Sequence, residues 1–463
     1  MSTITSSLSQ DQEKKLLSLF GHARLHLLYK ASVQGFTADA FHSRCDRQGP
    51  TVIVAFNTAR RVYGAYTSKD YTKSGQPVID GEAFLYSIKA EEPKPLKVVG
   101  IAGQPAFTDV DTSPDFGALV FLHDNKPSVL SNPGTNFNFQ APDMHGGDFA
   151  LIELEVYRVE SLGILLKKPW RNIQWTTEKK QELLQNISKY RPGISAVPQA
   201  RILLVGPVGA GKSSFFNSVN SIFRGSMTCQ AIAGTADKSV TTQYRTYRIM
   251  AGKRGQSLPL VLCDTMGLEE MTGAGVDIED LFNIFRGHIV DRYQFSPSGP
   301  LMPDSPGYKT LATLNDKIHC IAYVVDTCKA SILSQKMLDK FDMIRKKASQ
   351  MGIPQILLMT KVDEACSLVA DDLRTIYHSV YIQKKARDLS QCLGIPLSCV
   401  IPVKNYSEEL EPDQDTDILL LMALMQMLHY SDSFLENQLI YEEQEGHSLQ
   451  QSDKSCKILR PDL

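Results

Sequence analysis

The sequence lacks the features that mark a membrane-inserted, exported or disulfide-stabilised protein. Its apolar runs are too short to cross a bilayer, and its N-terminus is polar, with no hydrophobic stretch behind a basic start. The nine cysteines form no CxxC pair, and an odd count without an export signal favours reduced thiols. We therefore expect a cytoplasmic chain with no membrane span.

Strong charge of one sign, internal repeats and low-complexity tracts are also missing. The formal net charge of the 463 residues is -2, so neither nucleic acid nor an anionic membrane is indicated as a partner. Hydrophobic residues make up 43% of the chain and charged residues 22%, as in globular proteins. The length suggests two or three domains.

Periodicity and turn residues divide the chain into four parts, at residues 1–160, 161–198, 199–436 and 437–463. The first part is expected to be α+β, with a helix at 38–45 and strands at 51–56, 62–66, 83–88, 96–101, 117–121 and 149–157. The second is a connector with one helix, at 177–190. The last is a polar tail.

The third part alternates strands and helices, which is the pattern of an α/β domain with a mostly parallel sheet and helices on both faces. Its strands are expected at 201–205, 244–250, 259–264, 318–326, 355–359 and 398–403. Its helices are expected at 213–223, 332–350, 369–393 and 417–435.

Residues 206–213, GPVGAGKS, match the P-loop pattern G-x-x-x-x-G-K-[ST] between an apolar strand and an amphipathic helix. Glycines let backbone N–H groups turn toward phosphates, and the helix N-terminus adds positive potential. Lys212 is expected to reach the β and γ phosphates, and the Ser213 hydroxyl to bind Mg2+. The residues predicted to bind phosphate are Gly206, Gly209, Ala210, Gly211, Lys212, Ser213 and Ser214.

A second motif, DTMG at residues 264–267, follows the predicted strand 259–264. We expect Asp264 to hold Mg2+ together with Ser213, and the Gly267 N–H to contact the γ-phosphate. A switch threonine should supply another Mg2+ ligand before the strand 244–250. The candidates are Thr235, Thr241 and Thr242, of which Thr241 and Thr242 are preferred because they directly precede this strand.

A third motif, TKVD at residues 360–363, indicates the base. A carboxylate can accept two hydrogen bonds at once, and guanine, unlike adenine, offers a ring N–H and an amino group side by side. We therefore expect Asp363 to recognise guanine and the aliphatic stem of Lys361 to lie against the face of the base. The first position of this motif is usually Asn or Thr, so Thr360 is an accepted variant. Lys404 and Asn405 are expected in the last base-contacting loop.

One residue of a fast GTPase is missing. Ras-type proteins have a glutamine directly after DxxG that orients the attacking water, and here the residue is Leu268. A leucine neither donates to nor accepts from water, so intrinsic hydrolysis should be slow unless self-association or a partner raises it. Glu269 is a possible substitute, although a solvated acidic residue is the simpler interpretation.

Four functions remain open at this point. The first is a GTP-hydrolysing enzyme stimulated by self-association or a partner. The second, favoured by DTMGL, is an interaction protein gated by bound nucleotide with negligible turnover. The third is an ATPase, against which Asp363 argues. The fourth is a scaffold with an empty P-loop.

Several segments resemble the interferon-induced protein 44 family, namely ARILLVGPVGAGKSSFFNSV, YRTYRI, LPLVLCDTMGL, RGHIVDRYQF, KIHCIAYVVD and VKNYS. Three others, RLHLLYKASVQGFTADAFHSRCDRQGPTV, VYGAYTS and GEAFLYSI, resemble a TLDc domain in the form of the 44-like branch. The two resemblances extend from about residue 16 to residue 436.

The resemblance implies a TLDc-like domain at 1–160 and a P-loop G domain at 199–436. It also implies a cytoplasmic protein that is induced by interferon in antiviral and innate immune responses and binds GTP or GDP with Mg2+. The P-loop of the family falls on residues 206–213 and its DxxG on 264–267. A TLDc domain implies a protein-interaction module, because such domains engage the vacuolar proton pump.

Overall fold

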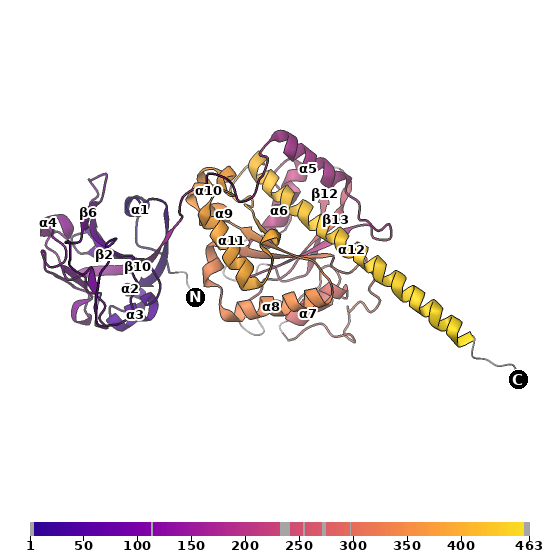
Figure 1. The fold of residues 1–463 in the computed structure, drawn as a ribbon, viewed down its shortest axis with the longest axis horizontal. Helices are drawn as coiled ribbons and strands as arrows, with labels where there is room; N and C mark the ends of the chain where they lie inside the picture. Colours follow the sequence, from indigo (N-terminus) through magenta and orange to yellow (C-terminus); the bar gives the residue numbers. More distant parts are fainter. Residues whose placement is uncertain are drawn as a thin grey trace. The chain divides into compact units, whose positions relative to one another are not determined.

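The computed structural model describes residues 4–112, 114–231, 241–252, 255–270, 275–296 and 298–457. The chain forms two compact units, Met1–Ile164 and Leu165–Leu463 (Figure 1).

The first unit is built on an antiparallel sheet with the strand order β1-β10-β2-β3-β5-β6. Those strands are β1 Ala23–Lys30, β2 Thr51–Asn57, β3 Val62–Thr67, β5 Phe84–Ile88, β6 Leu96–Val99 and β10 Leu151–Ser161. Short strands lie outside it, at β4 Pro77–Val78, β7 Phe107–Thr108, β8 Leu119–Phe121 and β9 Val129–Ser131. The helices are α1 Gln10–Leu17, α2 Ala31–Gln34, α3 Ala38–Cys45 and α4 Ala141–Met144.

Both faces of this sheet are covered, which explains why its central strands are almost continuously apolar. Along β2, Val52 and Val54 belong to one core cluster and Ile53 and Ala55 to another, and all four are fully buried. The strands and the helix expected between residues 38 and 157 are all present, with shifted ends. The pattern missed α1 and β1, and also the short elements α2, α4, β4, β7 and β9. Strand β1 lies at the edge of the sheet, and most of its residues are only half-buried, so it lacks a clear alternation.

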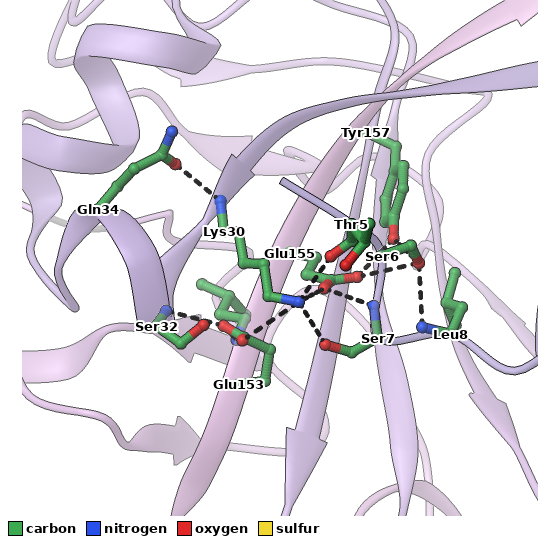
Figure 2. Close-up of polar contacts among 11 residues, drawn as sticks. Thr5, Ser6, Ser7, Leu8, Lys30, Ser32, Gln34, Glu153, Glu155 and Tyr157 are labelled. Atoms are coloured by element: carbon green, nitrogen blue, oxygen red, sulfur yellow. Dashed lines mark hydrogen bonds and ion pairs between the residues drawn. The ribbon is translucent and has the colours of Figure 1, made fainter. Parts of the chain in front are cut away.

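The N-terminal residues of this unit are held on β10 by a network of charged groups (Figure 2). The fully buried Glu155 accepts a hydrogen bond from the Ser7 N–H at 2.8 Å and pairs with Lys30 Nζ at 2.9 Å. Lys30 also donates to the Thr5 carbonyl at 2.8 Å. Because each of these charges has a partner, the network can remain buried at the sheet surface.

The second unit contains a six-stranded sheet with the order β12-β13-β11-β14-β15-β16. Its strands are β11 Ala200–Val205, β12 Arg245–Met250, β13 Ser257–Asp264, β14 Cys320–Asp326, β15 Gln355–Thr360 and β16 Val400–Pro402. All neighbours are parallel except β12, which is antiparallel to β13. The carboxyl ends of five strands therefore meet at one edge, where ligands bind in such sheets.

Helices cover both faces of this sheet (Figure 1). The set comprises α5 Thr177–Lys189, α6 Lys212–Arg224, α7 Ile278–Arg286, α8 Gln335–Gln350, α9 Val362–Ala365, α10 Ser367–Asp371, α11 Val380–Leu393 and α12 Gln414–Lys457. Helices α5, α6 and α12 share one apolar cluster with the sheet. Helix α8 packs on the opposite face, where Phe341 meets Tyr323 of β14 edge to face, 5.6 Å between ring centroids.

One predicted helix of this unit is divided in the structure, and another helix was missed. The single helix expected at 369–393 is divided into α10, a 3₁₀ turn at Leu373–Thr375 and α11, because Ser379 starts a new helix by accepting a hydrogen bond from the Ile382 N–H at 3.2 Å. Helix α7 was not predicted. Its signal is Asp277, whose side chain accepts from the Glu279 N–H at 2.8 Å and caps the helix.

Helix α12 is longer than the predicted 417–435 and continues through Lys457, into the part expected to be a polar tail. Contrary to the sequence expectation, its Gln414–Ile440 portion has the length and composition of a membrane span. However, 61% of that apolar window is buried within the fold, and Leu420, Leu424 and Leu428 are fully buried in the sheet cluster. Burial of this kind is what a core helix of a globular domain shows.

Candidate nucleotide-binding site

The P-loop joins β11 to α6 in a conformation that only its glycines allow. Gly209 and Gly211 have φ values of +74° and +93°, in the left-handed region. A Cβ at Gly206 would lie 2.1 Å from the Val324 carbonyl oxygen, so a side chain does not fit there. Gly211 is the N-cap of α6 and has no side chain to bond the first-turn N–H groups, which include those of Ser213 and Ser214. Those groups are therefore available to phosphate.

Lys212 opens helix α6 with its side chain buried under the loop. Its Nζ donates to the carbonyl oxygens of Gly206 and Pro207, both at 3.0 Å. Burial lowers the pKa of Lys212 to about 8, although the nearby Asp264 charge acts in the opposite direction. The loop thus holds a cation whose charged form lacks solvation, and a bound phosphate would stabilise that form.

The Lys212 pKa gives nucleotide binding a predicted pH dependence. In the protein without nucleotide, the Lys212 ammonium is half deprotonated near pH 8. A bound phosphate should raise the pKa of Lys212 in the complex. At pH 7 most of the free protein already carries the Lys212 charge that favours phosphate binding. As the pH rises through 8 this charge is lost, so the affinity for GDP should fall by roughly fourfold between pH 7 and 8.5. Calorimetry at pH 8 in two buffers of different ionisation enthalpy should show uptake of about half a proton. Zero uptake would contradict this assignment.

Three oxygen-bearing side chains meet beside Lys212. The Ser213 hydroxyl donates to Asp264 Oδ2 at 2.6 Å and lies 3.4 Å from Thr241 Oγ1. Asp264 is fully buried, and its Oδ1 accepts no hydrogen bond from the described residues. Burial raises the pKa of Asp264, while Lys212 and the Ser213 hydrogen bond oppose the shift. A buried carboxylate oxygen without a partner, next to two hydroxyls, fits a hard cation such as Mg2+.

The structure separates the three switch-threonine candidates. Thr241 is next to Ser213, whereas the Thr242 carbonyl accepts hydrogen bonds from Gln294 Nε2 at 3.0 Å and the Phe295 N–H at 3.2 Å. Thr235 falls outside the described residues. Thr241 is thus the threonine whose hydroxyl is placed beside the other expected Mg2+ ligands.

The DTMG segment packs directly on the P-loop. A Cβ at Gly267 would lie 2.6 Å from Val208 Cγ2 and 2.8 Å from the Val208 backbone nitrogen, so glycine is required for this contact. The Leu268 N–H donates to the Gly206 carbonyl at 3.0 Å. The Leu268 side chain is 1% exposed, which places an apolar group where a Ras-type GTPase has its glutamine.

The TKVD and VKN segments are joined to the P-loop by side-chain hydrogen bonds. Thr360 Oγ1 donates to the Ala210 carbonyl at 2.7 Å, and Asn405 Nδ2 donates to the Gly211 carbonyl at 3.1 Å. Two loops expected to surround the base therefore touch the loop expected to surround the phosphates. The Asn405 side chain is engaged in this contact.

The remaining polar groups of the base region lie around Asp363, which is half-buried in α9. Its carboxylate accepts no hydrogen bond within the part of the chain that the structure describes. Lys361, with φ of 57°, places its Nζ 3.2 Å from Asp326 Oδ2. Burial acts to lower the pKa of Lys404, but the hydrogen bond to Glu409 and the nearby Asp363 charge raise it. Asp363 is thus left with free acceptor atoms and a cation close by.

Sequence reasoning missed Asp326, although a signal was present. Asp326 ends the buried strand β14 just as Asp264 ends β13, so both carboxylates reach the same edge of the sheet. It also missed Val208 and Tyr406. The Tyr406 N–H donates to Ser218 Oγ of α6 at 2.9 Å, a contact between residues 188 apart that no local pattern reveals.

Comparisons with known proteins match both units. The TLDc domain family matches residues 2–160, and the family described as 50S ribosome-binding GTPase matches residues 201–361. Interferon-induced protein 44-like of Homo sapiens is 35% identical over 438 residues, 94% of this chain and 96% of that protein. Interferon-induced protein 44 of Homo sapiens is 35% identical over 435 residues, 94% of this chain and 95% of that protein. This chain belongs to the interferon-induced protein 44 family.

In this family member the TLDc match covers the α+β unit, and the GTPase match covers the sheet from β11 to Lys361 with both phosphate motifs. The second unit is therefore a GTPase-type domain that binds guanine nucleotide. Among solved structures, a GTP-binding protein from the hyperthermophilic archaeon Sulfolobus solfataricus in complex with GDP has a TM-score of 0.25 and 16% identity, over 50% of this chain and 52% of that chain.

Proposed function

We propose that this protein is a cytoplasmic, interferon-induced guanine-nucleotide-binding protein of the antiviral and innate immune response. In this proposal bound GTP or GDP orders the loops around Thr241 and Leu268, and those loops control contacts with protein partners. The names of the relatives support induction by interferon. The match to a TLDc domain supports a role for that unit in protein contacts.

The observation that carries the proposal is the 2.7 Å hydrogen bond from Thr360 to the Ala210 carbonyl. It joins the segment containing Asp363 to the segment containing Lys212, so one nucleotide could contact both. The free acceptor atoms of Asp363 match the adjacent N–H groups of guanine. Adenine lacks this pair of donors, which argues for GTP and GDP over ATP.

Mg2+ is proposed to accompany the nucleotide, held by Ser213, Thr241 and Asp264. The fit rests on the unpartnered, buried Oδ1 of Asp264 and its two hydroxyl neighbours. When bound, the cation supplies neutralisation of phosphate charge. The protein's own groups orient the nucleotide: Lys212 and the first-turn N–H groups of α6 contact its phosphates, and the buried position of Asp264 excludes water.

Hydrolysis is proposed to be slow at most. The Leu268 side chain is buried and its N–H is bonded to Gly206, so neither group is free to orient water. In a single-turnover experiment with protein in excess of GTP and Mg2+ present, we expect most GTP to remain uncleaved for hours. The Leu268→Gln variant should not cleave faster, because the side chain at this position is enclosed. Cleavage within minutes by the wild type would instead support a stimulated GTPase.

A further inference from the structure

The last base-contacting loop, residues 403–413, connects β16 to α12 and carries Lys404 and Asn405. We call it the second base loop. The connector, residues 161–198, contacts the chain at both ends of this loop. Neither the connector nor the loop lies within the residues matched by the GTPase family, 201–361. The contacts between the connector and this loop therefore lie outside the residues matched by that family.

At the entry to the loop, the connector is bonded to the backbone that leads into β16. Arg171 Nη1 donates to the Val400 carbonyl at 2.7 Å, and Nη2 donates to the Leu397 carbonyl. The guanidinium also lies 5.1 Å from the Trp170 ring and 5.9 Å from the Tyr377 ring. Because two backbone acceptors and two aromatic faces surround it, this arginine has little freedom to move away.

At the exit from the loop, the connector is bonded to the first turn of α12. Lys180 Nζ lies 2.6 Å from Asp417 Oδ2, and Asp417 is 1% exposed. The other oxygen of Asp417 accepts a hydrogen bond from the Tyr406 hydroxyl at 2.6 Å. One buried carboxylate thus joins helix α5 of the connector to the second base loop itself.

The second base loop is in turn bonded to the P-loop and its helix. The Tyr406 N–H donates to Ser218 of α6 at 2.9 Å, and Asn405 donates to the Gly211 carbonyl at 3.1 Å. A continuous set of hydrogen bonds therefore runs from Lys180 through Asp417 and Tyr406 to the nucleotide site. Loss of the Lys180 contact should loosen the base side of the site and leave the phosphate side unchanged.

From these contacts we infer that Lys180 and Arg171 are positioning residues for guanine, and that the connector controls the release of bound GDP. This inference rests on the guanine-nucleotide binding proposed above. A connector held in place keeps the second base loop against the purine. A connector whose Lys180 or Arg171 contact is broken lets the loop move, so that GDP leaves faster.

The test compares variants of Lys180 by GDP dissociation, measured by chasing a fluorescent GDP analogue from the full-length protein. Lys180→Ala should release GDP roughly tenfold faster, a change of about 1.4 kcal/mol. Lys179→Ala is the matched control, because the Lys179 side chain is as exposed as that of Lys180 but pairs, at 2.9 Å, with the exposed Glu182 of the same helix. It should behave as the wild type, and Lys180→Arg should restore slow release.

Removing Lys180 alone leaves a buried charge on Asp417, which destabilises the fold. The double variant Lys180→Met with Asp417→Asn removes the ion pair without leaving that charge, and it should also release GDP faster. Inorganic diphosphate contacts only the phosphate side, so its affinity should be equal in all variants. In nucleotide-free protein, amide hydrogen exchange in residues 403–413 should be faster in Lys180→Ala and in the double variant than in Lys179→Ala.

The possible results separate this inference from the function on which it rests. GDP release unchanged in Lys180→Ala and in the double variant, with tight binding by the wild type, would overturn the inference alone. An equal loss of diphosphate affinity would also overturn it, because the effect would then be general. Failure of the wild type to bind GDP would overturn the proposed function and the inference together.

Discussion

Replacing Asp363 with asparagine is expected to lower the affinity for GDP roughly 100- to 1000-fold, or about 3–4 kcal/mol. The carboxylate has free acceptor atoms for two neighbouring N–H groups of guanine, whereas an asparagine amide offers one acceptor and a donor. That donor would face the guanine amino group. Xanthine has an oxygen in place of the amino group, so the Asp363→Asn variant should prefer xanthosine diphosphate over GDP. Competition titrations with both nucleotides measure the change.

Asp371→Asn is the control for this experiment, because Asp371 is an exposed acidic residue in the neighbouring helix α10. It removes the same charge from the same region and should leave the preference for GDP intact. Equal affinities of Asp363→Asn and the wild type for GDP would show that another group recognises the base.

Replacing Lys212 with methionine should reduce GDP affinity by at least about 100-fold, or about 3 kcal/mol. Methionine keeps an apolar stem under the loop and removes the ammonium that faces the phosphates. Since burial lowers the pKa of Lys212 to about 8, its charge opposes folding of the nucleotide-free protein at neutral pH. The melting temperature without nucleotide should therefore not fall below that of the wild type, while the stabilisation by added GDP should disappear.

Lys336→Met provides the matching control, because Lys336 is an exposed residue in α8. It should show normal binding and normal stabilisation by GDP. A Lys212→Met protein that is still stabilised by GDP as strongly as the wild type would mean that the P-loop does not hold the phosphates.

The sequence was sufficient for those parts of the site that depend on neighbouring residues. The P-loop follows from the strand, the glycines and the helix that are contiguous around Lys212, and the motifs after β13 and β15 follow from buried strands that end in polar residues. Parallel strands bring their carboxyl ends to one edge, so the order of motifs implied their convergence.

Features that depend on distant residues could not be predicted in this way. Asn405 was expected to be near the base, but its side-chain contact with Gly211 joins residues 194 apart. The choice of Thr241 over Thr242 depends on Ser213 in another segment. The contacts of Arg171 and Lys180 cross more than 220 residues and involve backbone carbonyls or a buried carboxylate, which leave no periodic trace in the sequence.

Titration of the full-length wild-type protein with GDP and with ADP, each with Mg2+, tests the central claim most directly. Phosphate contacts at Lys212 are common to both nucleotides, whereas the Asp363 carboxylate can accept two hydrogen bonds only from guanine. We predict saturable binding of GDP at one site per chain, with ADP weaker by at least roughly 100-fold. Equal affinities for the two nucleotides, or no binding of either, would contradict the account.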